Sequence, residues 1–344
     1  MFFLSRLPRL PHLTGIASVL VPAAMLVGGL LAGAAAHAQE TTLRVNVFPT
    51  STNLALYWAI ENGMFARRGL KIEVQNTPNS DLQRAGLAEG KFEIAHAAVD
   101  NAVAMVEGAK KDVIIILGGD GGLNEFMVRG EINSFNDIRG KVLAVDAPNT
   151  AYALVAKKIL KNNGLLENRD YTLREVGGTL ARSAAISKDP MLVAGMVNPP
   201  FTFMLKEQGL KSMGRAQDLI GPYQAGGAFV MRDWAKANAG VLERYLAASI
   251  EGTRAAMDPA NRTAALDILV RRFKLSPQVA EQSYAALMTP GFGFYRDARF
   301  DLDGFAKVLS LRAEIEGQWG GVAPAPGKYI DLGYYDRAVK MIGP

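Results

Sequence analysis

The sequence predicts a two-lobed α/β fold, in which each lobe is a mostly parallel sheet flanked by helices and two crossover hinge strands join the lobes. Strand-like and helix-like stretches alternate from residue 43 onward, which is typical of a parallel sheet covered by helices. The run GGDGG at 118–122 interrupts this alternation, which then resumes. Beyond residue 232 the pattern is helical.

The first set of elements lies between residues 43 and 117. Residues 43–48 alternate and are rich in β-formers, residues 54–61 are apolar at helical spacing and stop at Asn62-Gly63, and residues 113–117 form a continuously apolar, buried type of strand. Between them we expect strands at 71–75 and 92–97 and helices at 81–88 and 101–107. The glycine run at 118–122 is interpreted as a crossover because it lacks a dinucleotide-binding fingerprint.

The second set begins at residues 125–129, and Ser134 with Asp137 forms a predicted capping box. The remaining expected strands are 141–145, 171–176, 191–197 and 226–231, and the expected helices are 151–162, 180–187, 201–207, 241–257, 262–273, 277–287 and 302–316. Cuts near 130 and 222 predict that residues 39–130 and 223–344 form a discontinuous lobe 1, with a helical C-terminal tail, and that residues 131–222 form lobe 2.

The N-terminus has the layout of a secretory signal peptide. Arg6 and Arg9 precede an uncharged apolar run at 14–36, and Ala36-His37-Ala38 is a small-x-small cleavage pattern. A membrane anchor is the alternative, since the run is long enough to span a bilayer. The cleavage pattern predicts that residues 1–38 are removed near Ala38. We expect the mature protein to be periplasmic, because the chain has no cysteine for lipid anchoring or disulfides.

The composition disfavours several function classes. Removing 38 of 344 residues leaves 306, and with 36 basic and 33 acidic side chains the mature chain carries a formal charge of +3 without a basic cluster, so we expect no nucleic-acid partner. Its single histidine, His96, lies in a strand-like run and could also lie near a cleft edge. A Cys/His metal site cannot be built, the run GLAEGK at 86–91 is not a P-loop, and no acidic pair stands out. We therefore expect a non-enzyme without cofactor or metal.

Four junctions follow predicted strands, and each opens a predicted helix with hydroxyl or amide side chains. The carboxyl ends of strands are where open α/β sheets bind ligands, and the start of a helix offers free N–H groups. Simple helix capping is the alternative for any single junction. Four such junctions in two lobes predict a ligand site in a cleft, formed by Thr50, Ser51, Thr52, Asn53, Asp100, Asn101, Asn149, Thr150, Tyr152, Asn198, Pro200 and Phe201.

The partial positive charge of helix N-termini suits an anionic head group. Asp100 does not fit a simple anion site, so it is either a capping residue or a partner for an amine or N–H group of the ligand. Tyr152 and Phe201 lie on the junctions themselves and are candidates to wall an apolar or aromatic part of the ligand.

Several segments resemble the substrate-binding proteins of ABC transporters for nitrate, sulfonates, taurine and the pyrimidine precursor of thiamine. These are NLALYWAIENGMF at 53–65 with Arg68-Gly69-Leu70, SFNDIRGK at 134–141, NPPF at 198–201, and Trp234 with DPANR at 258–262. The resemblance covers nearly all of the mature chain. It implies the type II periplasmic binding protein fold, with two α/β lobes that close on a ligand.

The resemblance also implies a function and its partners. We expect a monomeric periplasmic solute-binding protein that captures a small molecule, such as a sulfonate, taurine, nitrate, an aromatic carboxylate or a pyrimidine, and works with an ABC permease and ATPase. An enzyme of the pyrimidine-precursor synthase type is the alternative on the same fold, but that synthase uses a cysteine-rich segment. A sensor domain is a third class, which would need a following transmembrane or signalling segment.

Overall fold

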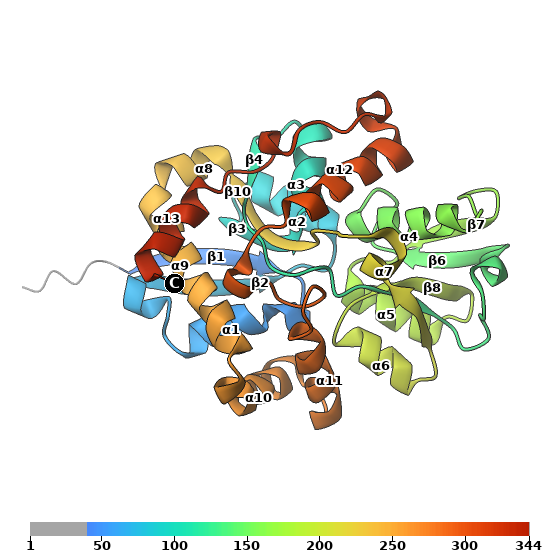
Figure 1. Cartoon of the computed structure of the whole chain (residues 1–344), viewed down its shortest axis with the longest axis horizontal. Coiled ribbons are helices and arrows are strands. Elements are labelled where there is room, and N and C mark those ends of the chain that lie inside the picture. Colours follow the sequence, from blue (N-terminus) through green and yellow to red (C-terminus); the bar gives the residue numbers. More distant parts are fainter. Residues whose placement is uncertain (1–39, 344) are drawn as a thin grey trace, which may run out of the picture. The chain divides into compact units, whose positions relative to one another are not determined.

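The computed structural model describes residues 40–343, so the predicted signal peptide lies outside the described residues. They form two five-stranded sheets flanked by helices (Figure 1), which confirms the predicted fold class. The first sheet has the order β2 (Leu70–Asn76), β1 (Thr41–Val47), β3 (Ile94–Ala98), β10 (Gly226–Met231) and β4 (Val113–Leu117). The second has the order β7 (Tyr171–Glu175), β6 (Lys141–Val145), β8 (Leu192–Val197), β5 (Glu125–Val128) and β9 (Lys211–Arg215).

Both sheets are mixed, with the same internal plan. In the first sheet β1 pairs in parallel with β2 and β3, whereas β10 runs antiparallel to β3 and β4. In the second, β6 pairs in parallel with β7 and β8, whereas β5 runs antiparallel to β8 and β9. The antiparallel strands β5 and β10 are those that follow a crossover, so each enters its sheet from the end opposite to that of the βαβ strands.

The two crossovers lie at residues 118–124, between β4 and β5, and at 221–225, before β10. The glycine run therefore connects the two sheets, as the sequence predicts. The predicted lobe boundary at residue 130 differs from the sheet assignment at one element. Strand β5 pairs with β8 and β9 through residues 125–128, so it belongs to the second sheet, although its short apolar sequence fits either sheet.

Helices cover both sheets. Those that open at the carboxyl ends of strands are α1 (Leu54–Glu61), α2 (Ser80–Ala88), α3 (Asp100–Glu107), α4 (Ala151–Asn162), α5 (Thr179–Lys188), α6 (Phe201–Glu207) and the short α7 (Ala216–Ile220). The main elements after β10 are α8 (Arg232–Ala237), α9 (Ala239–Met257), α10 (Arg262–Phe273), α11 (Pro277–Leu287), α12 (Leu302–Glu316) and α13 (Gly333–Ile342). No helix of residues 40–343 combines the length and apolarity needed to cross a membrane.

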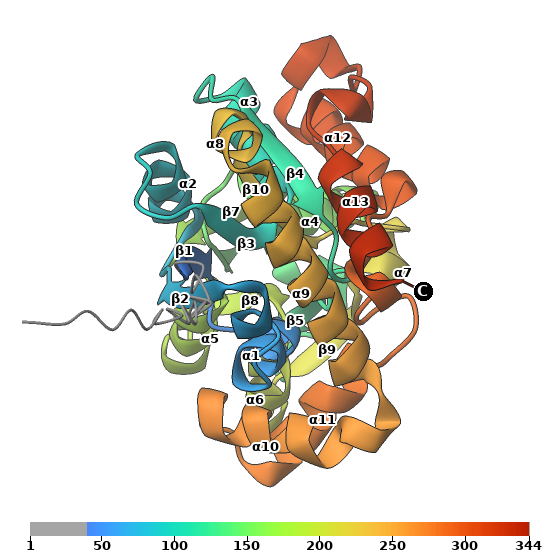
Figure 2. The ribbon, with the colours of Figure 1, turned by 90° about the vertical axis from the view of Figure 1, so that its left-hand side faces the viewer.

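Two helices of the C-terminal part organise the packing. Helix α9 lies between α1 and α13 and buries its apolar face against the first sheet (Figure 2). Helix α12 contacts α3 of the first sheet and α4 of the second. Ion pairs Lys158–Glu314 at 2.7 Å and Lys157–Glu316 at 3.2 Å fix its end to α4. The tail therefore connects both sheets.

The predicted capping box is confirmed. Ser134 precedes a 3₁₀ helix at Phe135–Ile138, and its backbone N–H donates to Asp137 Oδ2 at 2.9 Å. This turn leads directly into β6, the central parallel strand of the second sheet. The local sequence SFND thus fixes where the second βαβ set begins.

Candidate functional site

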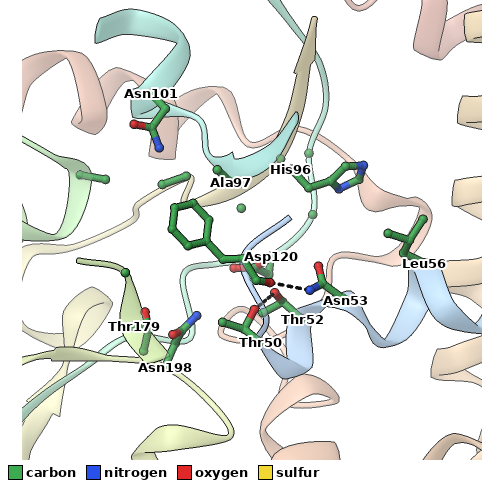
Figure 3. Close-up of a pocket in the computed structure, with 18 of the residues that line it drawn as sticks. Thr50, Thr52, Asn53, Leu56, His96, Ala97, Asn101, Asp120, Thr179 and Asn198 are labelled. Carbon is green, nitrogen blue, oxygen red and sulfur yellow. Dashed lines mark hydrogen bonds between the residues drawn. The ribbon is translucent and has the colours of Figure 1, made fainter. Parts of the chain in front are cut away.

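A cavity of about 120 Å³ lies between the two sheets, next to both crossovers (Figure 3). Its lining comes from the carboxyl ends of strands, the first turns of helices, the first crossover, the start of β10, the interior of α9 and the segment 294–298. This volume suits several waters or one small organic molecule. The polar or ionisable residues that line it are Thr50, Thr52, Asn53, Ser80, His96, Asn101, Asp120, Asp146, Thr150, Tyr152, Thr179, Arg182, Asn198, Ser249 and Thr253.

All four predicted junctions contribute to this cavity. Of the twelve predicted site residues, seven line it: Thr50, Thr52, Asn53, Asn101, Thr150, Tyr152 and Asn198. The hydroxyls of Thr50 and Thr52 are 2.7 Å apart, and Asn53 Nδ2 donates to the carbonyl of Phe48 at 2.6 Å. These hydrogen bonds stabilise the conformation of the first junction, residues 49–53.

Helix capping does not explain these residues. Within residues 40–343, the side chains of Thr50, Asn53 and Thr150 make no cap hydrogen bond to the helices that they precede. The same holds for the residues that precede α3 and α6. Asn79, by contrast, caps α2 by accepting from the N–H of Leu82 at 2.8 Å. The junction side chains are therefore free of the capping role that was their simplest explanation.

Two predicted residues lie beside the cavity in contacts between the lobes. The backbone N–H of Ser51 donates to the carbonyl of Pro199 in the second lobe at 3.2 Å. The carbonyl of Asn149 accepts from Arg312 at 3.1 Å, while the residue itself is exposed.

Three further predicted residues lie away from the cavity lining. Pro200 precedes α6, and Phe201 is buried in the apolar core of the second sheet. Asp100 accepts from Arg312 Nε at 2.5 Å and Nη2 at 2.7 Å, and both side chains are buried. Since both of its oxygens accept from this guanidinium, Asp100 is not available to a ligand amine, which was one of the two roles that the sequence left open.

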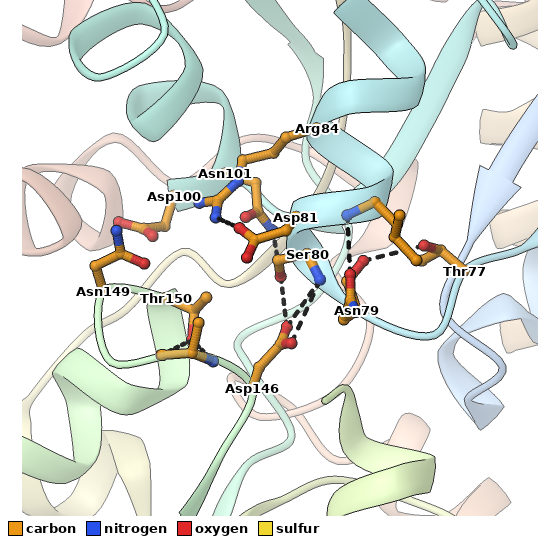
Figure 4. A network of polar contacts seen from close by, with 12 residues as sticks. Thr77, Asn79, Ser80, Asp81, Arg84, Asp100, Asn101, Asp146, Asn149 and Thr150 are labelled. Atoms are coloured by element: carbon orange, nitrogen blue, oxygen red, sulfur yellow. Dashed lines mark hydrogen bonds and ion pairs between the residues drawn. The ribbon is translucent and has the colours of Figure 1, made fainter. Parts of the chain in front are cut away.

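A hydrogen-bonded contact joins the lobes across the cavity (Figure 4). The backbone N–H and the hydroxyl of Ser80, at the start of α2, donate to Asp146 Oδ2 at 3.1 and 2.6 Å. Asp146 directly follows β6 of the second sheet. Asn101 Nδ2 extends the network to the Ser80 hydroxyl at 3.4 Å. The carboxylate of one lobe is thus bound at a helix start of the other, where the helix dipole favours negative charge.

The substitution Asp146→Asn is expected to weaken this contact. Hydrogen bonds to a charged group contribute about 1.5–3 kcal/mol and neutral ones about 0.5–1.5. The Ser80 amide should therefore exchange its hydrogen several-fold faster, which hydrogen–deuterium exchange of the peptide around Ser80 can measure. Asp81→Asn removes the same charge from the adjacent, exposed position and should leave the exchange unchanged. Equal exchange in both variants would contradict the role of Asp146.

Arg182 places a buried positive charge in the wall of the cavity. Its side chain in α5 is 2% exposed and donates to the carbonyls of Met196 at 2.8 Å and Gly177 at 3.0 Å and to the Thr179 hydroxyl at 3.0 Å. None of these partners is a carboxylate. Burial lowers the pKa of Arg182 below its ordinary value, and the nearby charge of Asp146 opposes that shift.

Asp120 supplies a buried negative charge from the first crossover. It is 7% exposed and accepts from the backbone N–H of Gly122 at 2.8 Å. Burial raises its pKa to about 6, while backbone N–H groups of Gly122 and Gly226 act in the opposite direction. No salt bridge among residues 40–343 includes Asp120, so this carboxylate is not neutralised by a protein cation.

The remaining titratable lining groups are uncharged near pH 7. His96 Nε2 lies 2.7 Å from the Tyr245 hydroxyl, and burial lowers its pKa to about 4. Burial, followed by the charge of Asp120, raises the pKa of Tyr152 above its ordinary value. Among the described lining residues, two carboxylates therefore oppose one guanidinium, which disfavours a bare anion in this cavity.

Sequence reasoning missed several lining residues, although some carried the same signal as the four junctions. Asn79-Ser80 and Gly178-Thr179 each follow a strand and open a helix, and Asp146 directly follows a strand. Asp120 lies inside the glycine run, which was interpreted only as a crossover. Arg182 is in the interior of a helix, and nothing local in its sequence marks it as part of a cavity.

A known protein family matches more than half of the chain. The sequence model of the family described as "NMT1/THI5 like" matches residues 51–262. No curated protein sequence matches the chain.

Solved structures share the fold at low sequence identity. The periplasmic nitrate-binding protein NrtA from Synechocystis PCC 6803 has a TM-score of 0.73 at 14% identity, covering 88% of this chain and 89% of that one. A ligand-binding component of an ABC-type import system from Staphylococcus aureus has a TM-score of 0.70 at 16% identity, covering 87% and 99%. The alkanesulfonate-binding protein SsuA from Xanthomonas axonopodis pv. citri has a TM-score of 0.65 at 17% identity, covering 83% and 94%. These similarities confirm the two-lobed periplasmic binding protein fold.

Proposed function

Because the chain belongs to the NMT1/THI5-like family, we propose that it is the substrate-binding component of an ABC importer. It captures a small organic ligand between its lobes and delivers it to a permease that an ATPase drives. The observation that carries this proposal is a polar cavity lined from both sheets, from the first crossover and from the start of β10, which follows the second crossover. A site at the crossovers couples ligand binding to rotation of one lobe against the other.

The names of the fold neighbours give part of the range of ligands that the sequence resemblance implies. Nitrate and alkanesulfonate are the ligands in the names of two neighbours. Taurine, aromatic carboxylates and pyrimidines complete the set that the sequence resemblance implies. Thr52, Asn101, Thr150 and Asn198 are the proposed polar contacts, because their side chains line the cavity from both lobes.

We also propose that the protein is exported and works in the periplasm. Residues 1–38 act as a signal peptide, and the mature protein is a periplasmic monomer with hinges at 118–124 and 221–225. Neighbours named as periplasmic or as import-system components support this assignment.

The test is ligand-induced closure together with uptake. Protein isolated from the periplasmic fraction should have an intact mass that begins near Gln39. A thermal-shift screen of sulfonates, carboxylates, nitrate, amines and pyrimidines should give a stabilising compound, since ligand at 100 times its Kd adds roughly 2.7 kcal/mol. X-ray scattering should then show a smaller radius of gyration, and deletion of the gene should abolish uptake of that compound.

The enzymatic alternative predicts a different result with the same material. In the cavity, His96 Nε2 pairs with the Tyr245 hydroxyl and Asp146 with the Ser80 hydroxyl, so the described contacts contain no Ser–His pair of the kind that activates a serine nucleophile. We propose that the protein is not an enzyme. Recovery of the bound compound unchanged after prolonged incubation supports binding alone, whereas multiple turnovers by the pure protein would support the synthase-type alternative.

A further inference from the structure

The charge at the first crossover bears on the class of ligand. Among the described lining residues, Asp120 is the one carboxylate that accepts hydrogen bonds from backbone N–H groups alone, because Asp146 also accepts from the Ser80 hydroxyl of the other lobe. A buried carboxylate without a cationic partner is costly unless a cation or further donors complete it. Backbone donors occupy part of the carboxylate, and its remaining acceptor capacity adjoins the cavity that Asp120 lines.

Neighbouring lining groups share this preference for a donor. The amide oxygens of Asn101 and Asn198 are buried and have no hydrogen-bond partner in the described chain. Both residues line the cavity, one from each lobe (Figure 3). Buried acceptors of this kind are usually satisfied, so they also point to N–H donors on the bound molecule.

Aromatic rings add a second, independent feature. Phe48, Tyr152 and Phe294 line the same cavity. The face of an aromatic ring attracts a cation as well as apolar groups. Arg182, the one cation among the described lining residues, is hydrogen-bonded to neutral oxygens of its own lobe, and the charge of Asp146 acts on it.

Resting on the function proposed above, we propose that the ligand carries a cationic N–H group, a protonated amine or an amidinium, and that Asp120 accepts its hydrogen bonds. The binding site therefore selects against bare anions such as nitrate and selects for amine-bearing molecules, including zwitterions. Gly226 lies against the Asp120 carboxylate and leaves room for it. A Cβ there would lie 2.1 Å from Asp120 Oδ2, so only glycine leaves the carboxylate in place.

The experiment compares probes that differ only by the N–H group. Taurine is matched with ethanesulfonate, benzylamine with benzyl alcohol, and nitrate serves as the bare anion. Binding is measured by thermal shift and by isothermal titration for the wild type, for Asp120→Asn and for Asp303→Asn. The last variant removes an equal charge from an exposed position of α12.

At least one amine is expected to bind tenfold or more tightly than its matched partner, and Asp120→Asn should remove that difference while Asp303→Asn preserves it. A charge-assisted hydrogen bond is about twice as strong as a neutral one, which sets this scale. Circular dichroism and the melting temperature of the ligand-free variant verify that Asp120→Asn folds.

Lowering the pH gives a second readout on the wild-type protein. The pKa of Asp120 is about 6, so its charge is lost as pH falls through that value, whereas the probe amines stay protonated. Tyr152 and Tyr295, the ionisable groups that feel the charge of Asp120, have raised pKa values and remain neutral. Affinity for the amine should therefore fall several-fold from pH 7.5 to roughly 5.

Three outcomes would overturn the proposal. They are tighter binding of ethanesulfonate or nitrate than of either amine, an unchanged amine affinity in Asp120→Asn, and the absence of a shift with both amines. If an anion binds and the amines do not, the inference about Asp120 fails and the proposed transport function stands. If no compound of the complete screen binds or closes the protein, the transport function itself loses its support.

Discussion

Replacement of Arg312 by methionine is expected to destabilise the protein by about 3–5 kcal/mol, the cost of leaving a buried charge without its partner. Arg312 and Asp100 have side chains that are 2% and 1% exposed. Their two hydrogen bonds are parallel and short, at 2.5 and 2.7 Å. Without the guanidinium, Asp100 would have to remain charged in an apolar site or become protonated.

The ion pair between Arg312 and Asp100 connects distant parts of the chain, so its loss should destabilise more than its immediate surroundings. Arg312 lies on α12, Asp100 opens α3 of the first lobe, and the carbonyl of Asn149 in the second lobe accepts from the same guanidinium at 3.1 Å. One side chain thus connects three segments that are distant in sequence. Arg312→Lys should not rescue the loss, because an ammonium group cannot form the two parallel bonds.

Urea unfolding of matched variants measures the effect. Arg337→Met breaks a half-exposed ion pair with Glu243 and should cost about 1 kcal/mol or less, as surface pairs do. The double variant Asp100→Asn with Arg312→Met removes the orphaned charge and should recover part of the lost stability. If Arg312→Met is no less stable than Arg337→Met, the pair has no structural role.

The fold was predictable because its elements carry local signals. Apolar alternation and helical spacing identify the βαβ sets, and the glycine run identifies the first crossover. Strand β9, with the sequence KSMGR, was missed because it has neither alternation nor β-branched residues. The antiparallel direction of β5 and β10 could not be predicted, since it depends on which sheet a strand joins after crossing and not on its own residues.

The site was predictable only in part, for a related reason. The rule that polar residues at strand ends gather at one edge brought Thr50, Asn101, Thr150 and Asn198 to one cavity. It left Asp100 open between a capping role and a ligand amine, because its partner is 212 residues away on α12 and has no local signature. From the sequence alone, an aspartate in a long-range ion pair cannot be distinguished from an aspartate that binds a ligand. The tertiary structure is therefore needed to decide whether Asp100 or a residue such as Asp120 is the ligand-binding carboxylate.

Replacement of Gly226 by alanine is expected to destabilise the protein by about 1–3 kcal/mol, the usual cost of forcing an extra methyl group into a packed interior. The new Cβ would lie 2.1 Å from Asp120 Oδ2 and 2.8 Å from its Cγ. Asp120 cannot move away freely, because its Oδ1 accepts from the N–H of Gly122 at 2.8 Å. The added methyl group therefore crowds Asp120, the carboxylate that lines the cavity from the first crossover.

A matched pair of variants separates this contact from a general effect of alanine. Gly240→Ala in α9 meets no atom within 4 Å and should be neutral or stabilising by up to roughly 1 kcal/mol, since alanine is the better helix former. Combining Gly226→Ala with Asp120→Ala removes the crowded carboxylate and should recover stability relative to Gly226→Ala alone. Denaturant unfolding measures the wild type, the three single variants Gly226→Ala, Gly240→Ala and Asp120→Ala, and the double variant. If the double variant is less stable than the sum of the two single variants predicts, the crowding lies elsewhere and Gly226 does not position Asp120.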